Sequence, residues 1–179
     1  VVGCSFITEA LGFDLFGRVA RWTSEIFSLE STNTPYATIQ EYPVAEGESR
    51  EYETLEDAVD ACGITAPLAP NWVPDRFENP DVSVAHISSG ICIYADYNFG
   101  DEFLSIRFNE SDRAEQRTVE KDSNAMTSYI VSGITHYIAM DQSIVKVVWS
   151  NGVFECHISG NLSEQEAKQI IDSIYEDDQ

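Results

Sequence analysis

Histidines are the side chains of this 179-residue chain best suited to acid–base chemistry near neutral pH, and there are three of them. His136 alternates with Ile138 and is expected to face the core, as a hydrogen-bonded packing residue rather than a ligand. His157 falls on the polar face of its strand, opposite Lys146, where we expect it to be solvated. His86 has no carboxylate or cysteine at motif spacing. The sequence matches no nucleophile-elbow, zinc-protease or phosphate-loop pattern.

Four cysteines could bind metal or form disulfides, but their spacing favours neither. No C-x-x-C pair occurs, and no cysteine has a histidine at zinc-ligand spacing. Strand alternation places Cys92 on a polar face and Cys156 on an apolar face. If both strands share one sheet, the two thiols point apart and cannot form a bond. We therefore expect Cys62, Cys92 and Cys156 to be free thiols, of which at least two are buried.

Residues 96–102 look faintly like a calcium-binding loop. The glycine comes one position early, and Arg107 stands where a bidentate glutamate is required. A hairpin turn explains this stretch better. We expect no metal site and no cofactor.

Two tryptophans are the candidate ligand-binding residues. Trp72 stands among Pro67, Pro70 and Pro74 on a segment that must be extended. An aromatic side chain there either plugs an edge of the core or lines a ligand groove. Trp22 has the same two interpretations on an amphipathic helix.

The charge of the chain restricts its partners. It has 31 acidic and 10 basic residues, a formal net charge of −21. Such a surface repels phosphate backbones, and no basic stripe is present, so nucleic-acid binding is excluded from the expected functions. The acidity is explained either by solubility or halotolerance, or by attraction of cations or cationic peptides.

The C-terminal stretch predicts a hairpin followed by a helix. Asn151-Gly152 is a strong type I′ turn signal, which would pair Trp149 with Phe154 on an apolar face. Ser163 and Glu166 form a capping box before a helical apolar stripe, so a helix should lie on the apolar face of this sheet. A second short helix should begin at Thr54 and end near a left-handed glycine, Gly63.

Most of the remaining chain reads as strands separated by turns. Expected strands cover residues 36–44, 82–88, 91–97, 102–109, 126–133, 135–140, 144–150 and 152–159. A hairpin should pair Ala95 with Leu104 and Ile93 with Ile106, and residues 45–50 read as a loop. The fold class is therefore α+β, a curved and mainly antiparallel β-sheet with helices packed on one face.

The beginning of the chain predicts an N-terminal amphipathic helix between Thr8 and Leu29, with an apolar stripe too wide to stay exposed. We expect residues 1–31 to form a membrane-proximal helix and residues 32–179 a single α+β domain. The chain does not start with methionine, so we expect a fragment or a processed form. It would be anchored either by a membrane span upstream of Val1 or by lipid on Cys4. The helix could also pair with a second copy in a homo-oligomer.

Several segments together resemble a known family. They are residues 21–27, 52–58, 62–67, 70–74, 158–163 and 170–174, with Trp149. This pattern is similar to the domain of unknown function 4367 family and covers most of the chain after about Thr54. The resemblance implies a Firmicutes-type protein with one membrane span and this domain outside the cell. Some relatives resemble anti-sigma factors and their regulators, and no catalytic residues are defined for the family.

Three classes of function follow. The leading one is a non-catalytic extracytoplasmic module of a membrane-anchored bacterial protein that senses or binds a ligand, protein or peptide. The alternatives are an enzyme, such as a hydrolase with a site assembled from scattered residues, and a structural or assembly protein. Clustered groups with shifted pKa values would favour the enzyme, and a groove lined by Trp72 or Trp22 would favour binding.

Overall fold

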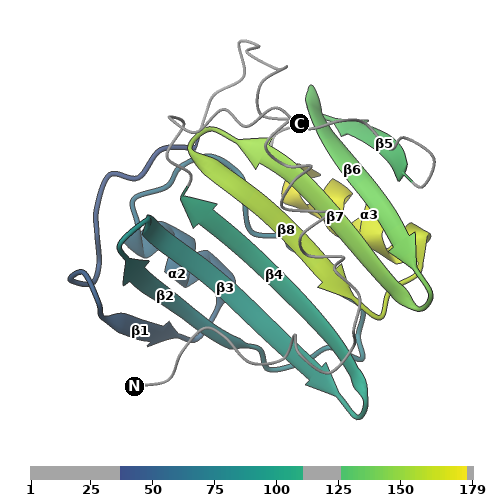
Figure 1. The fold of residues 1–179 in the computed structure, drawn as a ribbon, viewed down its shortest axis with the longest axis horizontal. Coiled ribbons are helices and arrows are strands. Elements are labelled where there is room, and N and C mark those ends of the chain that lie inside the picture. Colours follow the sequence, from purple (N-terminus) through teal and green to yellow (C-terminus); the bar gives the residue numbers. More distant parts are fainter. Residues whose placement is uncertain (1–36, 111–125, 177–179) are drawn as a thin grey trace.

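A single eight-stranded antiparallel sheet dominates the computed structural model, which describes residues 37–110 and 126–176 (Figure 1). In chain order the elements are β1 (Ser49–Tyr52), α2 (Leu55–Ala61), β2 (Asp81–Ile87), β3 (Gly90–Phe99), β4 (Glu102–Glu110), β5 (Met126–Val131), β6 (Ile134–Asp141), β7 (Ile144–Asn151), β8 (Phe154–Gly160) and α3 (Glu164–Ile174). The fold class is α+β with a curved sheet, as predicted. The expected helix between Thr8 and Leu29, and Trp22 within it, lie outside the described residues.

The sheet consists of two four-stranded meanders joined through their last strands. Its order is β1-β2-β3-β4-β8-β7-β6-β5, so β4 and β8 form the junction and β1 and β5 are the edges. At the junction Ile106 faces Ile158 and Phe108 faces Cys156. Residues far apart in sequence therefore meet at the centre of the sheet, where burial is most complete.

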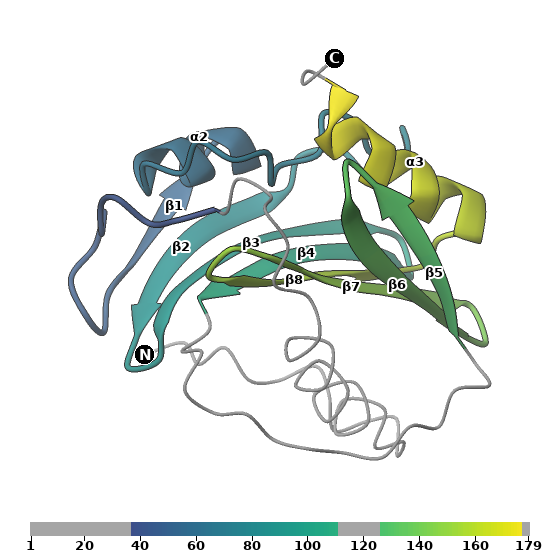
Figure 2. The ribbon, with the colours of Figure 1, turned by 90° about the horizontal axis from the view of Figure 1, so that it is seen from above.

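Both helices lie on the same side of the sheet (Figure 2). The strand residues that face them form the core, with Phe108, Trp149 and Phe154 at most 1% exposed. From α3, Ile170 and Ile171 are fully buried in the same cluster. Burying each such side chain contributes about 1.5–3 kcal/mol, so this face accounts for most of the stabilisation of the fold.

The helix caps predicted from the sequence are confirmed. The Thr54 side chain accepts a hydrogen bond from the Asp57 amide at 3.0 Å, at the start of α2. Gly63, with φ +63°, follows the end of that helix. Ser163 and Glu166 form a complete capping box on α3. Because capping depends on residues only three apart, local sequence was sufficient to locate both helix starts.

The predicted register of the last hairpin was wrong by two residues, although its apolar face was right. Trp149 pairs with Cys156, and Phe154 pairs with Asn151. Asn151 is buried, and its polar side chain has partners there. It accepts a hydrogen bond from Ala37 N at 3.3 Å and donates one to Pro67 O at 3.2 Å. The turn therefore begins at Gly152, whose φ is +65° and where a Cβ would lie 2.1 Å from Ala37 O.

The same two-residue shift affects the β3–β4 hairpin. Ala95 pairs with Ile106 rather than Leu104, and Ile93 with Phe108 rather than Ile106. Here too a glycine, Gly100 with φ +60°, opens the turn. A single positive φ at the first of the two turn residues is typical of type II′ turns. The registers predicted for both hairpins had placed the glycine at the second of the two turn residues.

The strand predicted over residues 36–44 was also wrong, because in residues 37–44 the structure has no strand. The amides of Gln40 and Glu41 donate to the Cys62 carbonyl at 3.1 and 3.2 Å, instead of joining a strand ladder. The edge strand is β1, which begins within the stretch 45–50 that had been interpreted as loop. In the described part of the chain, neither helix is long and apolar enough to cross a membrane.

Candidate functional site

The one candidate binding residue that the structure describes, Trp72, lies beside the C-terminal half of α3. Its amide donates to the Ser173 hydroxyl at 3.2 Å, and the Asn71 amide donates to the Ser173 carbonyl at 3.4 Å. The residue is 36% exposed, so it lies partly at the surface. Leu68 and Phe77, at 1% and 2% exposed, are the residues that anchor this segment instead.

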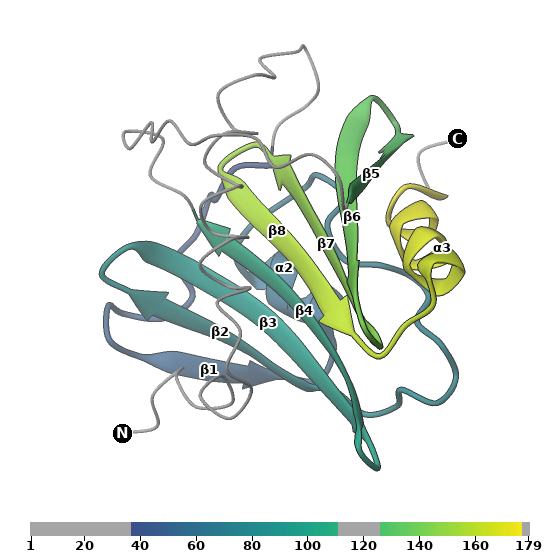
Figure 3. The same ribbon diagram turned by 45° about the vertical axis from the view of Figure 1, so that its right-hand side comes forward.

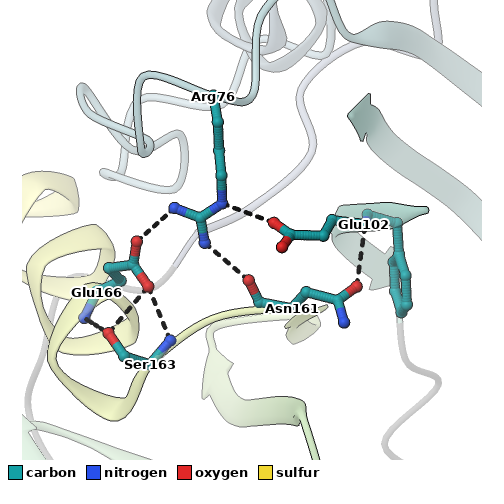
Figure 4. A network of polar contacts seen from close by, with 6 residues as sticks. Arg76, Glu102, Asn161, Ser163 and Glu166 are labelled. Atoms are coloured by element: carbon teal, nitrogen blue, oxygen red, sulfur yellow. Dashed lines mark hydrogen bonds and ion pairs between the residues drawn. The ribbon is translucent and has the colours of Figure 1, made fainter. Parts of the chain in front are cut away.

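The N-terminal end of α3 carries a cluster that sequence reasoning missed (Figure 4). We call Arg76, Glu102, Asn161, Ser163 and Glu166 the Arg76 cluster. The guanidinium donates to Glu102 Oε2 at 2.9 Å, to Glu166 Oε1 at 2.5 Å and to the Asn161 carbonyl at 2.8 Å. It thereby joins three segments: the connection before β2, the start of β4 and the start of α3. The planar fork of arginine suits this three-way contact.

The ion pairs and hydrogen bonds of the Arg76 cluster shift the pKa values of Arg76 and Glu166. Glu166 accepts a hydrogen bond from Arg76, and this bond, supported by those from Ser163, lowers the pKa of Glu166 to about 2. The hydrogen bond to Glu166 in turn raises the pKa of Arg76. Glu166 performs two tasks, because its second carboxylate oxygen accepts from the Ser163 amide at 2.8 Å. A glutamate held ionised by arginine and by a helix cap is a poor proton donor, so the cluster fits a structural role.

A sequence signal for this cluster existed. The capping box located Glu166, and Arg76 is one of only 10 basic residues in a chain with 31 acidic ones. An arginine in so acidic a chain is expected to form ion pairs with carboxylates. Which carboxylates it meets depends on the path of the connection before β2, and spacing along the chain does not specify that path.

The C-terminal end of α3 carries a second polar group, which we call the His136 cluster: His136, Trp149 and Tyr175. His136 Nε2 lies 3.0 Å from the Tyr175 hydroxyl, and the His136 and Trp149 ring centroids are 5.1 Å apart. His136 is fully buried, as predicted. Within the described residues, His136 Nδ1 and Trp149 Nε1 have no hydrogen-bond partner.

Burial keeps this cluster neutral. It lowers the pKa of His136 to about 4, and it raises the pKa of Tyr175 well above its ordinary value. Burial also raises the pKa of the nearby Cys156 thiol, so a reactive thiolate does not form there. A neutral imidazole beside a protonated phenol and thiol supports packing and hydrogen bonding rather than nucleophilic chemistry.

The cysteine predictions are confirmed for the described residues. Cys62, Cys92 and Cys156 are thiols that form no disulfide, and Cys62 and Cys156 are buried. Cys92 pairs with Asn109 on the polar face of the sheet, and its thiol donates to the Asn109 side chain at 3.0 Å. Burial raises the pKa of Cys62 to about 11. The two buried thiols, Cys62 and Cys156, therefore both have a raised pKa, the opposite of a reactive cysteine.

The remaining histidines lie at the surface of the domain. His157 is on the polar face of the sheet, but it pairs with Val148 and not with Lys146, because of the register shift. It is half-buried against Glu155, with Nε2 2.7 Å from a carboxylate oxygen, so the expectation of simple solvation was wrong. His86 stacks on Tyr42 with ring centroids 4.9 Å apart. In the described ranges, no group of three or more histidine, cysteine or acidic side chains is arranged to hold a metal ion.

Comparison with known proteins gives one match. A family model described as Domain of unknown function (DUF4367) matches residues 67–174. The match includes Trp72, the whole Arg76 cluster, His136 and Trp149, and it ends one residue before Tyr175. No curated protein and no solved structure matches the chain.

Proposed function

The chain belongs to the DUF4367 family, and we propose that it is a non-catalytic, extracytoplasmic binding module of a membrane-anchored bacterial protein. The partner is a protein or peptide, and the anchor is a span upstream of Val1 or lipid on Cys4. The rest of this proposal concerns the binding role, for which the described residues supply arguments.

Trp72 is the observation that carries the proposal. Its backbone is fixed by Ser173 on a helix whose core side is fully packed, while the residue is 36% exposed. A rigid, partly exposed aromatic loses little conformational entropy on binding, which is why tryptophan is enriched at the energetic centres of protein interfaces. A ligand that covers this indole gains apolar contact without first ordering the segment.

The most strongly shifted titratable groups support a non-catalytic role. Glu166 holds the start of α3, and His136 and Tyr175 hold its end. Each of these groups is either fixed in an ion pair or buried in neutral form. Catalysis requires a group that can exchange a proton with a bound substrate, and these groups are occupied by contacts within the fold.

Thermal unfolding of the full chain with a panel of cationic, neutral and anionic peptides tests this function. Cationic peptides should raise the melting temperature, because a ligand that binds only the folded state stabilises it, by about 2.7 kcal/mol at a hundredfold excess over Kd. The variant Trp72→Ala should lose at least part of this rise. Phe99→Ala, at a 55% exposed aromatic on the β3–β4 turn, is the matched control and should retain it.

Two results would contradict the proposal. One is a melting temperature that no peptide changes. The other is cleavage of a peptide by the chain, detected by mass spectrometry, which would favour the hydrolase alternative.

A further inference from the structure

The two edges of the sheet differ in a way that bears on partner binding. The edge strand β1 has four residues and includes the charged side chains of Arg50 and Glu51. The edge strand β5 has six residues, M-T-S-Y-I-V, with neither a charge nor a proline. Charges, prolines and short length are what normally prevent an edge strand from pairing with another chain. Only β1 has such protection.

The β5 edge is also held firmly in place beside α3 (Figure 3). It pairs with β6 along its whole length, from Met126 to Val131. The Tyr129 hydroxyl donates to Asp172 of α3 at 2.8 Å, and the Lys168 ammonium lies 5.5 Å from the centroid of the same ring. A strand that is fixed on one side and has no strand partner on the other among the described residues is already arranged to accept a further strand, which reduces the entropic cost of binding.

We propose that the outer edge of β5 docks an extended, cationic segment of a partner protein, which adds one more antiparallel or parallel strand to the sheet. This inference rests on the proposed binding function and specifies its partner. In the described part of the chain β5 pairs with β6 alone, so among these residues the backbone N–H and C=O groups of its other edge have no strand partner. Main-chain hydrogen bonds to such an edge give affinity, and alternate side chains give specificity.

The alternation of β5 indicates which side chains the partner needs. Met126, Ser128 and Ile130 point to the face away from the helices, and Ile130 is 66% exposed. Apolar side chains of the added strand would pack there. On the helix side the added strand passes Tyr129 and its acceptor Asp172. Basic side chains are favoured on that side, because the charge of nearby Lys168 is already paired with Glu164 at 2.7 Å.

Charge selects this occupant over a second copy of the chain. Two copies that each carry a net charge of −21 repel one another as they approach, whereas a cationic segment is attracted. The two occupants also respond oppositely to salt. Salt screens the attraction of a cationic ligand and therefore weakens its binding. It also screens the repulsion between two copies of the chain and would therefore strengthen self-association.

Fluorescence anisotropy with the full chain tests the proposal. The probe is a labelled synthetic peptide of alternating lysine and valine, about seven residues long, matching an average strand. Its counterpart of alternating glutamate and valine has the same strand propensity and the opposite charge. The lysine peptide should bind, the glutamate peptide should not, and raising NaCl from about 50 to about 500 mM should weaken binding roughly tenfold.

The variant Ile130→Lys places a protecting lysine on the edge and should reduce affinity for the lysine peptide about tenfold or more. The matched control Ile87→Lys makes the same change at a 46% exposed position at the end of β2, and should reduce affinity less than about twofold. Asp172→Asn should have an intermediate effect. Circular dichroism of each variant verifies folding.

The outcomes separate this inference from the function on which it rests. If the lysine peptide binds but Ile130→Lys and Ile87→Lys reduce its affinity equally, binding is not at β5. The proposal then fails while the binding function stands. If neither this peptide nor any peptide of the wider panel binds, both fail. Association of the chain with itself that grows with salt and disappears in Ile130→Lys would identify a second copy as the occupant and overturn the cationic partner.

Discussion

The two ends of α3 are held by opposite physical means. At its N-terminus, Arg76 and Glu166 form an ion pair whose side chains are 28% and 25% exposed. At its C-terminus, Tyr175 meets a fully buried, neutral His136 beneath the Trp149 ring. Charge is used where water still reaches the groups, and neutral hydrogen bonding is used where it does not. Ionising a group at the buried end would incur a desolvation penalty that the exposed end largely avoids.

The comparison predicts that the buried end contributes more to stability than the charged end. An exposed ion pair gains little, because solvent screens it. A buried aromatic ring contributes through apolar area and close packing. Four experiments test this order.

The largest effect should come from Trp149→Ala. Removing a fully buried indole leaves a cavity beside His136 and should lower the free energy of unfolding by about 3–5 kcal/mol in urea titrations. The matched control Trp72→Ala removes an indole at the surface and should cost less than about 1 kcal/mol. Equal costs would mean that the two tryptophans do not differ in burial as described.

Acid should next weaken the buried end through His136. Its pKa is lowered from 6.5 to about 4 in the folded chain. Between these values the unfolded chain binds a proton that the folded chain does not, so the free energy of unfolding should fall by about 3 kcal/mol as the pH drops from 6.5 to 4. Above pH 6.5 this contribution is fully present.

Urea titrations at several pH values measure this fall in wild type and in His136→Phe, which cannot titrate. The fall over that pH window should be largely absent in the variant. His157→Gln, on the polar face of the sheet, is the control that should keep it. A variant that keeps the full pH dependence would show that other groups cause it.

Arg76→Gln should have a smaller effect at the charged end. It leaves Glu102 and Glu166 without their cation, and we expect a loss of about 1–2 kcal/mol near neutral pH, reduced by the partial exposure of the pair. The pKa of Glu166 is lowered to about 2, so the stability from this pair is present above pH 4.5 and is lost as the pH falls toward 2. In the variant that acid-induced loss should shrink, as unfolding monitored by circular dichroism would show.

The smallest effect should come from Ser163→Ala, which removes the cap of α3. We expect a loss of about 1 kcal/mol, the usual contribution of a helix cap. Thr54→Ala at the start of α2 is a comparison, since the cap that it removes is hydrogen-bonded to Asp57 and not to a residue of the Arg76 cluster. A much larger loss for Ser163→Ala would show that the cap also positions Glu166 for Arg76.

Local sequence determined most of the elements, although not the edge strand β1, and it determined which face each predicted element buries. Strand alternation gave the correct faces for Cys92 and Cys156, and three-residue spacing gave both helix caps. Strand alternation also predicted that His136 faces the core. These features follow from periods of two and 3.6 residues and from contacts within one helical turn, so neighbouring residues are sufficient to specify them.

Only the tertiary structure decided the registers, the two clusters at the ends of α3 and the exposure of Trp72. A shift of two residues leaves every strand side chain on the same face, so alternation cannot choose between such registers. In the last hairpin the choice was made by Asn151, which bonds to Ala37 and Pro67 far along the chain. Arg76 likewise meets Glu102 and Glu166 because separate segments converge. Their contacts depend on how the chain packs in three dimensions, and no local pattern of residues contains that information.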